Sequence, residues 1–246
     1  MQGVAEVVPV SSSAQLELLP FLLGWPAAPD RTTFAAGLHA GSCLGIAVAL
    51  RGDLARLGRR DLMVLAATTV PAGLAGVLVE DAVDARLGRP GPTAALLAAA
   101  GVLLWVADRR PVTTPVVGRG DAAAAALAQL AALAPGVSRS GATLTALRLR
   151  GVDRPAAARF SLLMSLPVTA GAAAWTVARG DRATTLRSLR VGAPVAAVSA
   201  AAVTRALDRR GGAPVGGAAL YRLSVAAAVA GRLAHARRAG RRKGLS

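Results

Sequence analysis

Cysteine and histidine are almost absent from this chain of 246 residues. Cys43 is its single cysteine, and His39 and His235 are its two histidines. A lone cysteine excludes an internal disulfide framework and a metal site built from several thiolates. Because Cys43 lies in an apolar stretch, we expect it to pack against neighbouring helices.

Negative charge is also scarce, with 13 acidic residues against 29 basic ones. In a soluble protein the net charge of +16 would suggest a nucleic-acid partner. Here aromatic residues make up only 3% of the chain, and the arginines lie between apolar segments. This placement is typical of charges beside a membrane, which face anionic lipid and influence topology. We therefore expect membrane lipids, and no nucleic acid, as partners.

Long apolar runs are abundant, since 54% of the residues are hydrophobic and the mean hydropathy is +0.49. A membrane-spanning helix needs roughly 17–25 mostly apolar residues. An alanine-rich soluble bundle would instead need a polar face on each helix, which these segments lack. The predicted fold class is therefore an all-α protein that crosses the membrane several times. Charge-free stretches cover 32–50, 62–79, 93–106, 122–138, 160–178 and 191–204.

We expect one integral membrane domain over 1–246, with about six spans and two re-entrant helix pairs. Its halves, about 1–110 and 111–246, would each begin with a broken helix pair and continue with three spans. An odd number of spans inverts the second half relative to the first, as in transporters with inverted repeats. The spans are expected near 34–50, 62–80, 93–107, 157–178, 190–207 and 215–233.

The basic segments leave the orientation in the membrane open. The loops at 51–60 and 205–213 and the carboxyl-terminal tail are all basic, and alternating spans cannot easily place all three on one side. The first residues lack the basic region of a cleavable signal peptide. A charged amino terminus beside a membrane-embedded motif is costly, so we expect the natural start to lie upstream or the first helix to be shortened.

A first polar motif lies within the first fifteen residues. Gln2 and Glu6 are four residues apart and would share one face of a helix. Pro9 ends that helix, so the serines at 11–13 follow on irregular backbone. An ionisable side chain at membrane depth marks a functional site by default. Glu6 is therefore a candidate catalytic and metal-binding residue, with an interfacial carboxylate as the alternative.

A second polar motif, at 135–143, has the parts of an anion site. Gly136 lets the backbone approach a ligand closely, and Arg139 offers a planar guanidinium suited to phosphate. A short helix expected from about residue 140 to 150 would aim its first N–H groups at the same place. The alternative is a capped helix start with an arginine that reaches the interface. The candidate phosphate contacts are Gly136, Ser138, Arg139, Ser140 and Thr143.

Together the two motifs predict a phosphate or diphosphate site inside the membrane. A carboxylate can hold Mg²⁺ or Ca²⁺, and Mg²⁺ often bridges carboxylates to substrate phosphates. A serine beside such a site acts as a nucleophile or only as a hydrogen-bond donor. Glu17 belongs either to this site or to the interface. Residue chemistry alone does not distinguish cleavage from transport.

Both motifs resemble those of the undecaprenyl-diphosphatase family of the bacitracin-resistance type. The family's first motif is Glu or Gln, three residues, Glu, and then Pro-Val-Ser-Ser-Ser/Thr-Gly-His. Its second, Pro-Gly-x-Ser-Arg-Ser-Gly-Ala-Thr, matches 135–143 at every defined position. Stretches at 38–42, 160–167 and 220–222 are also similar, in the same order along the chain. The first motif is matched by Gln2, Glu6, Pro9, Val10, Ser11, Ser12 and Ser13.

The resemblance implies hydrolysis of undecaprenyl diphosphate to undecaprenyl phosphate and inorganic phosphate, which recycles the lipid carrier of cell-wall synthesis. The protein would lie in the bacterial plasma membrane, use Mg²⁺ or Ca²⁺ and bind a polyprenyl diphosphate, with a homodimer left open. Glu6 would hold the metal or position water, Ser12 would be the nucleophile, and Arg139 would neutralise the leaving phosphate. The expected substrate contacts are Gln2, Ser11, Ser13, Gln15, Gly136, Ser138, Ser140, Thr143 and Arg222.

One position departs from the family's pattern: Ala14-Gln15 replaces Gly-His. Glutamine forms hydrogen bonds but cannot serve as a general acid or base near neutral pH. Either the family's histidine serves binding, another group such as Glu6, Glu17 or His39 carries the proton, or this chain turns over slowly. We expect His39 to pack within its helix.

Three functions other than hydrolysis by this family compete for the same motifs. Membrane phosphatases of the phosphatidic-acid type also use a Ser-Arg sequence, but they need histidines with an acidic partner that this chain lacks. A polyprenyl-phosphate transporter or flippase is the main alternative, because inverted repeats with broken helices are typical of transporters. A lipid-diphosphate binder without turnover is a third.

Overall fold

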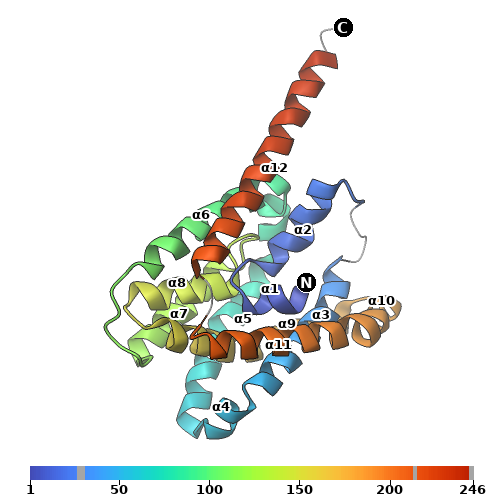
Figure 1. The fold of residues 1–246 in the computed structure, drawn as a ribbon. Coiled ribbons are helices and arrows are strands. Elements are labelled where there is room, and N and C mark those ends of the chain that lie inside the picture. The colour runs from blue at the N-terminus through green and yellow to red at the C-terminus, as the bar shows by residue number, and fades with distance from the viewer. Residues whose placement is uncertain (27–30, 213–214, 244–246) are drawn as a thin grey trace.

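The computed structural model describes residues 1–26, 31–212 and 215–243. Within these ranges the chain is almost entirely helical and has no β-strand, only an isolated bridge between Thr114 and Val152. The all-α prediction is confirmed. The helices gather into one bundle, from which the end of α12 (Val215–Lys243) projects (Figure 1).

The first half opens with a broken pair, as predicted. Helices α1 (Gln2–Val7) and α2 (Ser12–Leu23) are separated by a break that contains Pro9, and each is too short to cross a bilayer. Longer helices follow the pair, and a short helix that the sequence did not predict lies between the first two. They are α3 (Arg31–Ala49), α4 (Arg51–Arg56), α5 (Arg59–Leu87) and α6 (Pro90–Asp108).

The second half repeats this order. Helices α7 (Arg119–Ala131) and α8 (Arg139–Leu149) flank the second break. Asp121 accepts the N–H of Gly118 at 2.9 Å and so caps the start of α7. After α8 come α9 (Arg154–Arg179), α10 (Arg182–Arg187), a π-helical turn (Ser188–Gly192), α11 (Ala193–Arg209) and α12.

Four helical segments of the described chain are long and apolar enough to cross a membrane. A shorter apolar helix covers Phe34–Ala49. All five coincide with expected spans, which agrees with a polytopic membrane protein. The four segments are Arg59–Val79, Pro90–Asp108, Arg154–Arg179 and Arg182–Arg209.

Helix α3 packs closely on α11 and the turn before it through glycines spaced four residues apart. A Cβ added to Gly41 would lie 2.1 Å from the carbonyl oxygen of Ala193, and Gly37 and Gly45 make similar approaches. Small residues at this spacing let two membrane helices approach at backbone distance. The contact fixes the helix that carries His39.

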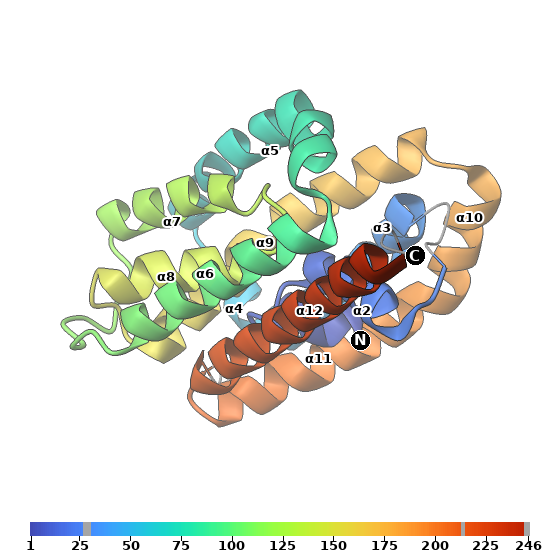
Figure 2. The same ribbon diagram turned by 90° about the horizontal axis from the view of Figure 1, so that it is seen from above.

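Helices of the two halves are interleaved rather than side by side as separate blocks. Helix α1 packs on α11 while α7 packs on α5, and α6 packs on α12 (Figure 2). By their order in each half, α1 corresponds to α7 and α5 to α11, so the same contact occurs twice between the halves. Two related repeats would produce this pattern. The boundary near residue 110 and the inverted orientation of the halves stay predictions.

Candidate active site

Both helix breaks end at a serine with left-handed backbone. Ser11 has a φ of 67° and Ser138 a φ of 71°, a region that residues other than glycine rarely adopt. Each such conformation costs roughly 1–3 kcal/mol and persists only where its surroundings enforce it. Ser11 precedes α2 and Ser138 precedes α8, so both breaks are held open at the start of a helix.

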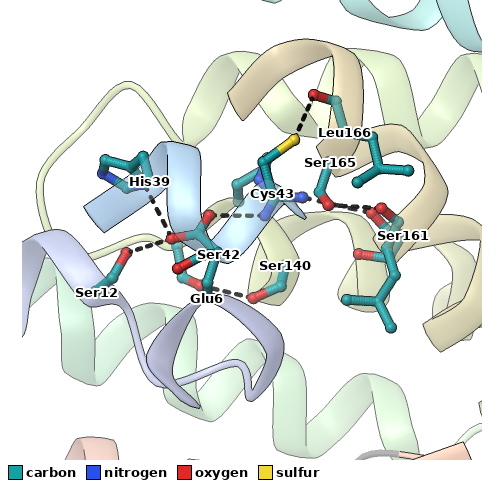
Figure 3. Close-up of polar contacts among 12 residues, drawn as sticks. Glu6, Ser12, His39, Ser42, Cys43, Ser140, Ser161, Ser165 and Leu166 are labelled. Carbon is teal, nitrogen blue, oxygen red and sulfur yellow. Dashed lines mark hydrogen bonds and ion pairs between the residues drawn. The ribbon is translucent and has the colours of Figure 1, made fainter. Parts of the chain in front are cut away.

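The carboxylate of Glu6, on α1, is the centre of the site (Figure 3). Its Oε1 accepts a hydrogen bond from Nη2 of Arg139 at 2.9 Å. Its Oε2 accepts from Oγ of Ser12 at 3.1 Å and from the amide of Gln2 at 3.2 Å. Nδ1 of His39 lies 3.3 Å from the same oxygen. One buried carboxylate thus joins two motifs that are 133 positions apart in the sequence.

Arg139 is held in place from α9 as well as by Glu6. Its Nη1 donates to the carbonyl of Ser161 at 3.4 Å, and its own carbonyl accepts from the hydroxyl of Thr143 at 3.0 Å. The hydroxyls of Thr143 and Ser161 lie 2.6 Å apart. The guanidinium is therefore fixed before any ligand arrives, with 13% of the side chain still exposed.

The two motifs open onto one cavity of about 190 Å³. Its wall combines hydroxyls, a guanidinium, an imidazole and a carboxylate with apolar side chains of α9. Hydroxyls and a guanidinium are the groups that bind phosphate through charge-assisted hydrogen bonds. The lining residues are Ala5, Glu6, Ser12, Ser13, His39, Ala132, Ser138, Arg139, Ser140, Val168, Thr169 and Ala172.

Several expected substrate contacts brace the site instead of lining it. Gly136 has a φ of 99°, and a Cβ there would lie 2.5 Å from the carbonyl oxygen of Thr93, so its backbone approaches α6 and not a ligand. Thr143 is fully buried behind Arg139, and Ser11 is fully buried within its break. Gln2 does not line the cavity and reaches the site through Glu6 and the ring of His39. These residues do not line the cavity, and the substrate contacts expected of them stay predictions.

Gln15 also points away from the cavity. Its Nε2 donates to the carbonyl of Val10 at 3.0 Å, and its Oε1 accepts from the hydroxyl of Tyr221 at 2.8 Å. The side chain is 4% exposed. Both ends of its amide are therefore taken by the protein, and the contact between Gln15 and substrate stays a prediction.

His39, on α3, supplies the imidazole that lines this cavity. The expectation that it packs within its helix is wrong, since its ring reaches Glu6 and the amide of Gln2. Glu17 takes the opposite direction and accepts a hydrogen bond from Thr93 of α6 at 2.8 Å. Of these two candidates for proton transfer, only His39 lies at the site.

Arg222 is buried behind both breaks and does not line the cavity. Its Nε donates to the carbonyl of Pro9 at 2.6 Å, and its Nη1 donates to the carbonyl of Val137 at 3.3 Å. The expected contact between this arginine and phosphate stays a prediction. Arg222 binds the chain at each break.

Comparison with known proteins places most of the chain in one family. Residues 1–211 match the family model described as "Bacitracin resistance protein BacA". This chain belongs to the BacA family. Curated relatives named undecaprenyl-diphosphatase include one from Geobacter sulfurreducens, 41% identical over 191 residues that make up 70% of this chain and 70% of the relative. Another, from Gemmatimonas aurantiaca, is 39% identical over 191 residues, 70% of this chain and 71% of the relative.

The BacA motifs were found from the sequence, but Ser161 and Thr169 were not assigned a role, and His39 was named only as a possible proton carrier. Ser161 holds Arg139, and Thr169 and His39 line the cavity. Ser161 and His39 lie within the short stretches that resemble the family, where a polar residue interrupts an apolar helix. That interruption was the available signal. Thr169 follows the second of those stretches.

The BacA cavity fits a divalent cation only if the substrate supplies some of its ligands. The described residues contain no group of three or more His, Cys, Asp or Glu side chains that could form an all-protein cage. Glu6 is the carboxylate among the cavity-lining residues, with the hydroxyls of Ser12 and Ser13 beside it. One carboxylate completed by substrate phosphate oxygens is a usual arrangement for Mg²⁺.

Proposed function

We propose that this BacA-family protein hydrolyses undecaprenyl diphosphate to undecaprenyl phosphate and inorganic phosphate in the bacterial plasma membrane. The contact between Glu6 and Arg139 carries the proposal. It gathers a carboxylate, a guanidinium and hydroxyls in one cavity of a membrane protein. Relatives named undecaprenyl-diphosphatase, at 39% and 41% identity, support it.

Arg139 binds the terminal phosphate of the substrate. Its planar fork matches the spacing of two phosphate oxygens, and its charge is permanent. Ser138 and Ser140 line the same wall at the start of α8, where Ser138 caps the helix by accepting the N–H of Gly141. The positive end of the helix dipole there also favours an anion. These donors stabilise the negative charge that develops during phosphoryl transfer.

Ser12 and Glu6 have the geometry of a nucleophile and its base, with 3.1 Å between the hydroxyl and the carboxylate. Oγ of Ser12 attacks the terminal phosphorus, and its proton passes to Glu6. The bridging P–O bond breaks and undecaprenyl phosphate leaves. Water then cleaves the phosphoserine, which restores the hydroxyl and releases inorganic phosphate.

A divalent cation, Mg²⁺ or Ca²⁺, is part of the proposal. Glu6 would hold it together with the substrate's phosphate oxygens, as the donor set of the cavity allows. When bound, the cation screens the charge of the diphosphate and so assists the departure of undecaprenyl phosphate.

The polyprenyl chain of the substrate would leave the cavity along its apolar side. Val168 and Ala172 of α9 form part of that wall, next to the polar groups of the motifs. The transporter alternative is not favoured, because the relatives are named as diphosphatases. A homodimer stays a prediction.

Phosphate release from undecaprenyl diphosphate by the purified protein in detergent tests the proposal. The unaltered chain should release phosphate with Mg²⁺ or Ca²⁺ and stop when a chelator is added. Arg139→Ala should lower kcat by about 10²–10³, the usual cost of one lost transition-state donor. Equal release by both proteins, or none by the folded unaltered chain, would contradict it.

A further inference from the structure

Arg222 is the largest fully buried side chain among the described residues, and it has no counter-ion there. Its Nη2 atom also has no hydrogen-bond partner in the described part of the protein. Removing an unpaired charge from water costs several kcal/mol even after the protein relaxes. A cost of this kind inside a membrane protein indicates a function for the residue.

The two carbonyls that Arg222 binds belong to different breaks. Pro9 lies two residues before Ser11, and Val137 lies directly before Ser138. These serines are the two residues with left-handed backbone described above. A single guanidinium therefore fixes the chain at both strained positions.

The space around Arg222 is shaped for this side chain. A Cβ added to Gly141 of α8 would lie 2.3 Å from Nη2, and one added to Gly101 of α6 would lie 3.1 Å from the Cβ of Arg222. The side chain thus passes between two helices where glycines leave room. Only a narrow range of positions is open to the guanidinium, so it holds the carbonyls in a defined geometry.

The residue before Arg222 adds a second attachment to the first break. Tyr221 donates to Gln15 at 2.8 Å, and Gln15 donates to the carbonyl of Val10. Tyr221 and Arg222 both lie on α12, and both reach the chain around the start of α2. Helix α12 is therefore attached to the first motif at two points.

We propose that Arg222 is a positioning residue, which sets the separation of the two breaks so that Ser12 and Arg139 meet at Glu6. It acts through the carbonyls of Pro9 and Val137 and does not touch the cavity. Its effect on turnover rests on the proposed function, whereas its effect on the breaks does not. A planar guanidinium can donate to two carbonyls at once, which the ammonium of lysine cannot do in the same geometry.

Arg222→Lys keeps the charge and removes the fork, so it separates geometry from electrostatics. We expect kcat for phosphate release to fall at least tenfold in Arg222→Lys, while KM changes less than threefold. In Arg222→Met, kcat should fall further. Arg148→Lys is the matched control. Arg148 is also a buried arginine that donates to backbone carbonyls, those of Asp108 and Arg110 among them, but it lies outside the cavity wall. It should lose thermal stability and keep its kcat.

A second measurement does not depend on catalysis. Spin labels at Leu23→Cys and Leu149→Cys, in a Cys43→Ser background, report the separation of α2 and α8, the helices that follow the two breaks. Both leucines are exposed. Pulsed electron paramagnetic resonance should give one narrow distance distribution for the parent, and a broad or shifted one for Arg222→Met. Arg148→Met should keep the narrow distribution.

The two readouts separate failure of this inference from failure of the proposed function. If the parent releases no phosphate but Arg222→Met still shifts the distance between the labels, only the proposed hydrolysis would be overturned. An active parent whose Arg222 variants keep kcat and the narrow distribution would overturn the positioning role alone. A loss of kcat that follows thermal stability equally in Arg222→Lys and Arg148→Lys would also overturn it.

Discussion

At the scale of single residues, the site depends on how many groups share one carboxylate. Glu6 accepts hydrogen bonds from Arg139, Ser12 and Gln2 and contacts His39. Hydrogen bonds to a charged group contribute about 1.5–3 kcal/mol each, so this arrangement keeps the carboxylate in one orientation. The same contacts aim the hydroxyl of Ser12 at the cavity.

The neighbouring serines provide a matched pair for testing that hydroxyl. Both Ser12 and Ser13 line the cavity, but only Ser12 donates to Glu6, whereas Ser13 pairs with Ser11. Ser12→Ala should lower kcat by a hundredfold or more, because it removes the attacking oxygen. Ser13→Ala should stay within about fivefold of the parent, about 1 kcal/mol or the loss of one neutral hydrogen bond. Steady-state phosphate release measures both, and similar values for the two would exclude Ser12 as nucleophile.

At the scale of elements, the position of His39 depends on the packing of α3 against α11. Gly41 and Gly45 bring the two helices to backbone contact, and Gly37 packs on Ser188 in the turn before α11. Because the neighbour of Gly41 is a backbone carbonyl, it cannot move aside as a flexible side chain could. The packing of these two helices is therefore sensitive to a single methyl group.

Gly41→Ala should destabilise the protein by about 1–3 kcal/mol, the usual cost of overpacking a tight core. Gly73→Ala is the control, since a Cβ on this residue of α5 would meet nothing within 4 Å. The control should keep or slightly raise stability, because alanine favours helix more than glycine does. Thermal unfolding in detergent compares them, and an unchanged midpoint for Gly41→Ala would show that α3 and α11 can separate without cost.

The elements themselves were largely predictable from the sequence, whereas their meeting points were not. Pro9 and the Pro135-Gly136 pair marked the breaks because proline and glycine end helices locally. The orientation of Gln15 and His39 depends on Tyr221 and on α3 packing, which involve partners far away in the sequence. Local pattern therefore identified the motifs, and tertiary contacts decided which side chains reach the cavity.

At the scale of the whole molecule, ion pairs gather the basic loops at one end. Arg159 at the start of α9 binds Asp53 of α4 at 3.0 Å and Asp208 of α11 at 2.6 Å. Arg154 binds Asp108 at the end of α6 in the same way. The loops near 51–60, 108–110 and 205–212 thus share one face, while the end of α12 projects from the opposite side of the bundle (Figure 1). The sequence left this arrangement open because ion pairs between distant loops are not visible in it.

The shared face predicts the orientation in the membrane. Short loops rich in arginine stay on the cytoplasmic side, so this end should face the cytoplasm. The basic end of α12 then lies on the other side of the membrane. A cysteine at Gly52 should then be protected from a membrane-impermeant thiol reagent in intact cells, and one at Gly180, after α9, should react. Both variants carry Cys43→Ser, and opened cells should label both. Labelling of Gly52→Cys in intact cells would reverse the assignment.

The hydrogen bonds from Arg222 to the two breaks also set an order of assembly during synthesis. Both breaks leave the ribosome before α12, the helix that holds them, has been made. Until that helix inserts, Ser12 and Arg139 would be present in one polypeptide without a fixed separation. A nascent or shortened chain that lacks α12 should therefore bind the membrane yet be unable to turn over lipid, so the enzyme should become active only after α12 has been made.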